Sequence, residues 1–123
     1  EYHIVKPDSF CNAVRGQVEK MGARWDNDIL SLCSGSLDKK HALRQAGYMR
    51  IYCPAYLLPQ VADYTLRCED YDVKKALLDV MGWHNNAYTS NICLDAAHKI
   101  NADTSLPIDV REEALRTIRR IEK

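Results

Sequence analysis

The sequence predicts an all-α fold, a compact bundle of six or seven short helices that is stapled by about two disulfides. Apolar residues recur at helical spacing in nearly every segment, and no two segments read convincingly as paired strands. Five cysteines stand singly along the chain. The 123 residues are 46% apolar and 28% charged, which is typical of one globular domain, so we treat 1–123 as a single helical domain.

The three C-terminal segments carry the clearest helical pattern. In residues 70–82, Asp70 is the expected N-cap, Gly82 the expected stop, and the apolar residues follow i, i+3, i+4, i+7, i+8 spacing. Residues 85–100 and 108–123 repeat such a stripe, the latter with Asp109 as the expected cap. The predicted inner faces are Val73, Ala76, Leu77, Val80 and Met81; Tyr88, Ile92, Cys93, Ala96, Ala97 and Ile100; and Val110, Ala114, Leu115, Ile118 and Ile121.

The N-terminal half divides less clearly into helices. Residues 8–22 predict a helix that ends at Gly22 and has Met21 inside, and residues 28–33 predict a separate short one. Ser36 is the expected cap of a helix over 37–49 with Leu37, Ala42, Leu43 and Ala46 inside. Residues 48–53 also alternate like a strand, but helix is preferred because no strand partner exists. Pro54 must end whichever element precedes it, because its ring clashes with the previous helical turn. Pro59 can then stand in the first turn of a helix over 59–68.

The cysteines predict an oxidising compartment. Cys11, Cys33, Cys53, Cys68 and Cys93 lack the two-residue spacing of zinc or redox sites, and most fall on apolar helix faces. Two bridges between helices would each add about 2–4 kcal/mol. The alternative is five buried thiols acting as small hydrophobes. The odd cysteine could be buried, could join a second chain in a disulfide-linked dimer, or could pair beyond this sequence.

From these cysteines we expect a secreted, extracellular or periplasmic protein. The chain begins at Glu1, as it would after removal of a signal peptide or as a piece of a longer protein. No apolar run is long enough for a transmembrane segment. The 17 basic and 17 acidic side chains cancel, so no nucleic-acid partner is expected.

No constellation in the sequence specifies a reaction, so we expect no enzyme, no cofactor and no metal. The pairs Asp38–His41 and Asp95–His98 have i, i+3 spacing, but neither has a further ligand at a diagnostic spacing. The acids between positions 63 and 79 could line a groove, yet helix capping explains them better.

The stretch Tyr48–Cys68 is the most informative about function. Tyr48, Tyr52 and Tyr56 recur every fourth residue at the expected border between core and water. Tyrosine combines a large apolar area with a polar tip and is enriched at protein interfaces. We predict that Tyr48, Tyr52, Tyr56, Tyr64 and Trp83 form a surface that binds a protein partner, with Trp25 extending it. The alternative is a carrier of a small hydrophobic ligand in an internal cavity.

Overall fold

The computed structural model describes residues 21–84, 86 and 89–123, and the described part is all helical. None of the described helices is both long enough and apolar enough to cross a membrane. The helices are residues 21–33, α2 (Lys39–Ile51), the 3₁₀ turn η2 (Ala55–Leu57), α3 (Leu58–Arg67), α4 (Tyr71–His84), α5 (Ser90–Ala102) and α6 (Ile108–Ile121).

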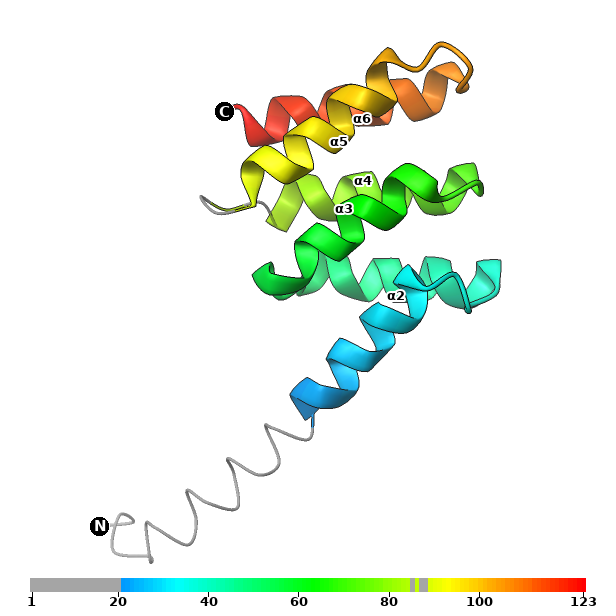
Figure 1. Cartoon of the computed structure of the whole chain (residues 1–123), viewed down its shortest axis with the longest axis vertical. Helices are drawn as coiled ribbons and strands as arrows, with labels where there is room; N and C mark the ends of the chain where they lie inside the picture. Colours follow the sequence, from blue (N-terminus) through cyan, green and yellow to red (C-terminus); the bar gives the residue numbers. More distant parts are fainter. Residues whose placement is uncertain (1–20, 85, 87–88) are drawn as a thin grey trace, which may run out of the picture.

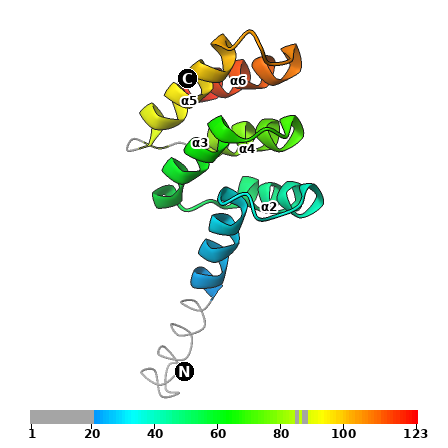
Figure 2. The ribbon, with the colours of Figure 1, turned by 45° about the vertical axis from the view of Figure 1, so that its right-hand side comes forward.

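The helices stack as hairpins in two rows (Figures 1 and 2). In one row α2 packs against α4 and α4 packs against α6, and in the other row α3 packs against α5. Within each hairpin, α3 packs against α4 and α5 against α6. The helix over residues 21–33 lies at the N-terminal end of the stack. This layered order, in which each hairpin contacts mainly its neighbours, is that of α-solenoid proteins.

The predicted inner faces of the C-terminal helices are largely confirmed. Leu77, Val80 and Met81 of α4 are fully buried, as are Cys93 of α5 and Ala114 of α6. Ala76, Leu115 and Ile121 are only partly buried, and Ile92 is 43% exposed at the border of a groove between α3 and α5. The predicted inner residue Tyr88 lies outside the described residues, as do residues 8–20 of the predicted helix over 8–22.

Two expected helix boundaries are wrong because glycine stays inside a helix. Residues 21–33 form one helix that passes through Gly22, so Gly22 does not stop it and no separate helix begins at Asp28. Met21, predicted inside, is 62% exposed. Helix α4 also continues past Gly82 to His84. A Cβ at Gly82 would lie 3.1 Å from Arg120 Cδ, so this glycine allows the close packing of α4 and α6.

Helix capping agrees with the prediction at α4 but not at two other helices. The Asp70 carboxylate accepts hydrogen bonds from the backbone N–H groups of residues 72 and 73, as expected of an N-cap. Helix α2 is capped by Asp38, which accepts from the His41 N–H, whereas Ser36 donates to the Ser31 carbonyl. Asp109 lies within the first turn of α6 and forms a 2.8 Å ion pair with Lys75.

The cysteines contradict the predicted bridges. Cys33, Cys53, Cys68 and Cys93 are free thiols and each is at most 7% exposed. Helical periodicity cannot distinguish a disulfide-bonded cysteine from a buried free thiol, because both lie on the apolar face of a helix. Cys11 lies outside the described residues, so a disulfide-linked dimer stays a prediction for Cys11 alone.

Burial should protect these thiols from modification. We expect a thiol-alkylating reagent at neutral pH to leave Cys33, Cys53, Cys68 and Cys93 unmodified in the folded chain and to modify all four in denaturant. Intact and peptide mass spectrometry of the unreduced protein measures this directly. A mass lower by four hydrogens, with these cysteines blocked even in denaturant, would contradict the free thiols and restore the two bridges.

The same burial predicts a loss of stability at alkaline pH. Burial raises the pKa of Cys33 and Cys93 from 9.0 to about 11, and burial together with the nearby Cys33 and Cys93 raises that of Cys53 to about 12. The unfolded chain loses these protons first. The stabilisation is therefore complete below pH 9 and is lost as the pH rises through 11 to 12.

Each thiol contributes on the order of 2 kcal/mol to this change. Urea denaturation across that pH range should show the fall in the free energy of unfolding. The Cys93→Ala variant should show a shallower fall than the unaltered chain. Equal pH profiles for the two proteins would contradict the role of the Cys93 thiol.

Candidate functional site: an aromatic patch at the N-terminal end

The outer face of α2 carries large side chains that stay largely exposed beside the other described helices. Ala42, Gln45, Ala46 and Met49 are buried and form the inner face of α2. Three and four residues apart on the outside stand the side chains of Tyr48, Ile51 and Tyr52, which are 48%, 82% and 59% exposed.

Two further aromatic residues join this face. The Trp25 ring lies 6.3 Å from the rings of both Tyr48 and Tyr52, measured between centroids. Tyr56, in η2, is 66% exposed and donates its hydroxyl hydrogen bond to the Asp26 carboxylate. That hydrogen bond is the main reason that the pKa of Tyr56 rises to about 12. We call Met21, Trp25, Tyr48, Ile51, Tyr52 and Tyr56 the N-terminal aromatic patch.

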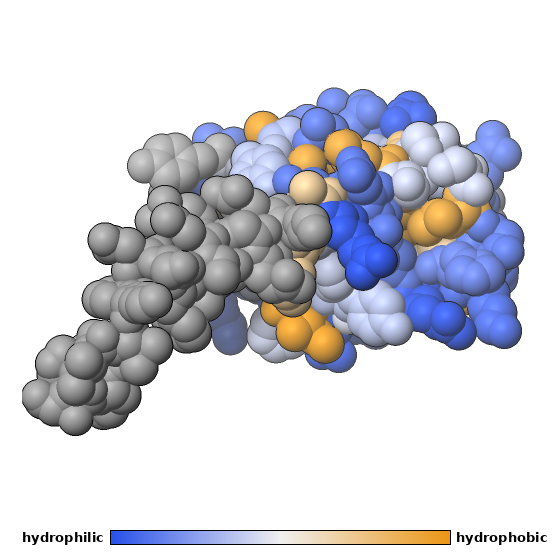
Figure 3. Space-filling model, turned by 90° about the horizontal axis from the view of Figure 1, so that it is seen from below, coloured by the Kyte–Doolittle hydropathy of each residue, from blue (hydrophilic) through white to orange (hydrophobic). Residues whose placement is uncertain are grey.

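The patch is shallowly hollowed. Met21, Gly22, Trp25 and Tyr52 line an open pocket of about 400 Å³. Figure 3 views the molecule from this end and shows hydrophobic residues exposed in several places, among residues of intermediate hydropathy and hydrophilic residues. The residues of the N-terminal aromatic patch thus come from three elements that are separate in sequence.

The patch includes three of the five residues predicted for the binding surface, Tyr48, Tyr52 and Tyr56. Tyr64, on α3, is half-buried against the core, and the Arg67 guanidinium lies 5.5 Å from its ring centroid. Trp83, at the end of α4, is 53% exposed but has its own partners. The ring contacts among the described residues join Trp25 to two tyrosines and join Trp83 to none.

Two members of the patch were not predicted as binding residues, namely Met21 and Ile51. The spacing of Met21 with Cys11, Val14 and Val18 assigns it to the inner face of the predicted helix over 8–22. The i, i+3, i+4 spacing of Tyr48, Ile51 and Tyr52 was a signal that could have identified Ile51, because it places the three on one side of a helix that continues to residue 51.

Trp83 belongs to a polar cluster that joins three helices. The guanidinium carbons of Arg50 and Arg120 lie 5.5 and 4.8 Å from the ring centroid of Trp83. The Asp79 carboxylate accepts from Trp83 Nε1 at 3.1 Å and from Arg120 at 2.9 Å, and its second oxygen lies 3.0 Å from Arg50 Nε. His84 Nε2 lies 2.7 Å from the Arg50 carbonyl oxygen. These contacts tie α2, α4 and α6 together.

Removal of the Asp79 carboxylate should lower the free energy of unfolding more than removal of an ordinary surface carboxylate. We expect Asp79→Ala to lower the free energy of unfolding by about 2 kcal/mol, because two guanidinium groups and an indole N–H lose their acceptor. The matched control is Asp95→Ala, whose exposed i, i+4 pair with Lys99 should contribute at most about 0.5 kcal/mol. Urea denaturation compares them, and equal losses would contradict a stabilising role for the cluster.

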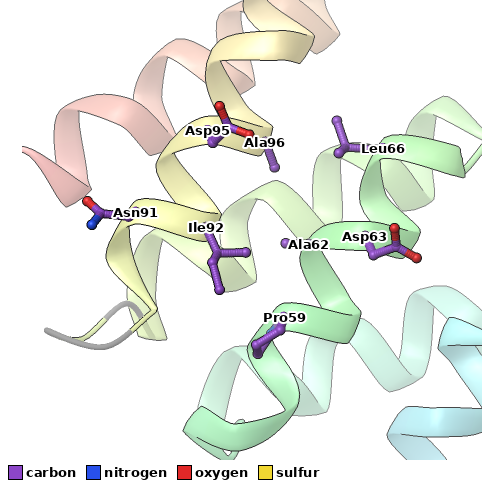
Figure 4. A pocket seen from close by; sticks show the side chains of 8 residues that line it. All are labelled: Pro59, Ala62, Asp63, Leu66, Asn91, Ile92, Asp95 and Ala96. Atoms are coloured by element: carbon purple, nitrogen blue, oxygen red, sulfur yellow. The ribbon is translucent and has the colours of Figure 1, made fainter.

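A second hollow runs between α3 and α5. Its floor contains the buried Ala62 and Ala96, and its rim carries Leu66, Ile92 and two carboxylates (Figure 4). The pocket measures about 400 Å³. Both rim carboxylates are already paired within their own helices, Asp63 with Arg67 at 3.1 Å and Asp95 with Lys99 at 3.0 Å.

The predicted acid and histidine groups do not converge on one site. His41 Nδ1 lies 2.7 Å from Asp38 on an exposed face, and Asp95 pairs with Lys99. Asp70 caps α4, and Asp72 pairs with Lys39 at 2.7 Å, which lowers the pKa of Asp72. Among the described residues, no group of three or more histidine, cysteine or acidic side chains could hold a metal ion.

Comparison with known proteins yields no relative. No family model, no curated protein and no solved structure matches this chain.

Proposed function

We propose that this chain is a helical recognition domain that binds another protein through the N-terminal aromatic patch. The observation that carries the proposal is the exposure of Tyr48, Tyr52 and Tyr56 beside the partly buried ring of Trp25, at one end of the described stack. At roughly 200 Å² for each ring side chain, the three exposed tyrosine fractions leave about 350 Å² accessible. A patch of that size on a soluble domain is commonly functional.

The side chains of the patch are held in place by the fold, and this favours binding. Helix α2 is held by its buried inner face, and the hydroxyl of Tyr56 is tied to Asp26. Aromatic side chains that are already ordered lose little conformational entropy when a partner covers them. Tyrosine and tryptophan are also the side chains most often found at the energetic centre of protein interfaces.

The chemistry of the patch favours a protein over other partners. All six patch residues are uncharged, and the tyrosine hydroxyls offer hydrogen bonds at the edge of an apolar surface. A nucleic acid would require basic side chains that neutralise phosphates, and the chain has no net positive charge.

The carrier alternative has less geometric support. A carrier of a small apolar ligand is expected to enclose it in a cavity, whereas the pockets described above are open hollows of the surface. The predicted extracellular or periplasmic location stays a prediction, and the four free cysteines remove the argument on which it was based.

The proposal predicts where a partner can be captured. A photo-cross-linking amino acid at Ile51 should form a covalent adduct with a protein partner, and this adduct should disappear in the Tyr52→Ala variant. The matched control is the same amino acid at Ile108, which is 69% exposed on α6. Adducts that form equally from positions 51 and 108 would indicate non-specific contact.

Affinity for the purified partner then tests the patch directly. We expect Tyr52→Ala to weaken binding at least tenfold with an unchanged free energy of unfolding. Tyr71→Ala, which removes a 43% exposed tyrosine from the first turn of α4, should leave affinity unchanged. Calorimetric titration measures both, and equal affinities for the two variants would contradict the proposed function.

A further inference from the structure

A small polar hollow lies between the helix over residues 21–33 and α2. Asp28 lines it from the first helix, and Arg44 and Gln45 line it from α2. Its volume is about 230 Å³, whereas pockets for drug-sized ligands begin at about 300 Å³. At about 30 Å³ for each water molecule, the hollow has room for about eight waters. It therefore suits a molecule of about eight non-hydrogen atoms.

Two opposite charges line this hollow and do not pair with each other. The Asp28 carboxylate and the Arg44 guanidinium are both exposed, and neither forms an ion pair with any described residue. Because the two groups border one small hollow and stay apart, each keeps its capacity to bind a charged group placed between them.

Gln45 adds a buried polar group that has no partner. Its side chain is 8% exposed and lines the hollow, and its Nε2 forms no hydrogen bond with any described residue. Native proteins rarely bury an amide N–H without an acceptor, because the unmade hydrogen bond lowers stability. Rotation of the amide by 180° exchanges Nε2 with Oε1, so the side chain can turn its N–H groups toward a molecule in the hollow.

The remaining wall of the hollow offers apolar surface. Leu37 is partly buried against the core, and Tyr48 is 48% exposed beside it in the lining. A leucine side chain and the ring of a tyrosine pack favourably against a small apolar group. The hollow thus combines one positive charge, one negative charge, one unsatisfied amide and an apolar wall.

We propose that this hollow binds a free α-amino acid with a small apolar side chain. The ligand carboxylate pairs with Arg44, which can hold it through two parallel hydrogen bonds, and also accepts from the amide of Gln45. The ligand ammonium group pairs with Asp28, and its side chain lies against Leu37 and Tyr48. A zwitterion meets both charges of the hollow at once, whereas an ion of either sign would leave one of them unpaired.

This inference goes beyond the proposed function and does not depend on it. The hollow uses charged and amide groups of its own and shares Tyr48 with the N-terminal aromatic patch. If the amino acid does not bind, the capture of a protein partner from Ile51 is unaffected, so the two proposals succeed or fail separately.

NMR titration of the isotope-labelled whole chain with L-valine tests the site. We expect a dissociation constant of about 1 mM, as for a very small ligand in an open hollow, with shifts of the backbone N–H signals of Asp28, Arg44 and Gln45. L-valine methyl ester lacks the carboxylate and N-acetyl-L-valine lacks the ammonium group, so each should bind at least tenfold more weakly. Absence of shifts at valine concentrations well above that constant, or equal binding of all three compounds, would overturn the inference.

Charge-neutral variants assign the two ion pairs. Arg44→Gln and Asp28→Asn should each weaken L-valine binding at least tenfold, because each leaves one charge of the ligand without its partner. Arg24→Gln removes an exposed arginine that does not line the hollow and should leave the affinity unchanged. Equal affinities for Arg44→Gln and Arg24→Gln would show that the valine lies elsewhere.

Gln45→Met separates ligand binding from a structural role of Gln45. Methionine has a similar volume and no amide that needs a partner, so the free energy of unfolding should be unchanged or higher. Affinity for L-valine should nevertheless fall at least threefold. Urea denaturation and the same titration measure the two effects, and full affinity in this variant would contradict the contact between Gln45 and the ligand.

Discussion

The packing of α4 between α2 and α6 is the constraint on which the rest of the structure depends. Leu77, Leu78, Val80 and Met81 are all 0% exposed, so α4 is apolar toward more than one neighbour. Such a helix must be covered on several sides. Helix α4 also forms a polar contact with α6, in which the Thr117 hydroxyl donates to the Leu78 carbonyl oxygen at 2.8 Å.

Lys74 shows how the same helix accommodates a buried charge. Its side chain is 4% exposed, and its Nζ donates to the carbonyl oxygens of Thr65 and Leu66 at the end of α3. Those carbonyls have no partner within their own helix, so the lysine satisfies them and completes the α3–α4 connection. Burial lowers the pKa of Lys74, as expected for an ammonium group removed from water. The helix therefore joins α2, α3 and α6 through both apolar and polar contacts.

A stack built on a central helix leaves two ends, and their chemistry distinguishes them. The outer faces of α5 and α6 carry mostly charged and polar side chains with Ile92 and Ile108 exposed among them, whereas Tyr48, Ile51 and Tyr52 are exposed together at the other end. Because apolar surface is stabilised by removal from water, the N-terminal end has the larger driving force for association. The proposed recognition follows from this difference.

The sequence by itself determined the all-α class and most of the inner faces of α4 to α6, because helical periodicity records which residues must leave water. It also placed Tyr48, Tyr52 and Tyr56 at the border between core and water, where they are exposed. The N-cap at Asp70 could also be predicted from the sequence, because capping involves residues that are close together along the chain. Only the tertiary structure decided the continuity through Gly22 and Gly82, the free state of four cysteines and the separation of Trp83 from the tyrosines. Each of these depends on which helices meet, and a pattern along one chain does not contain the distances between its segments.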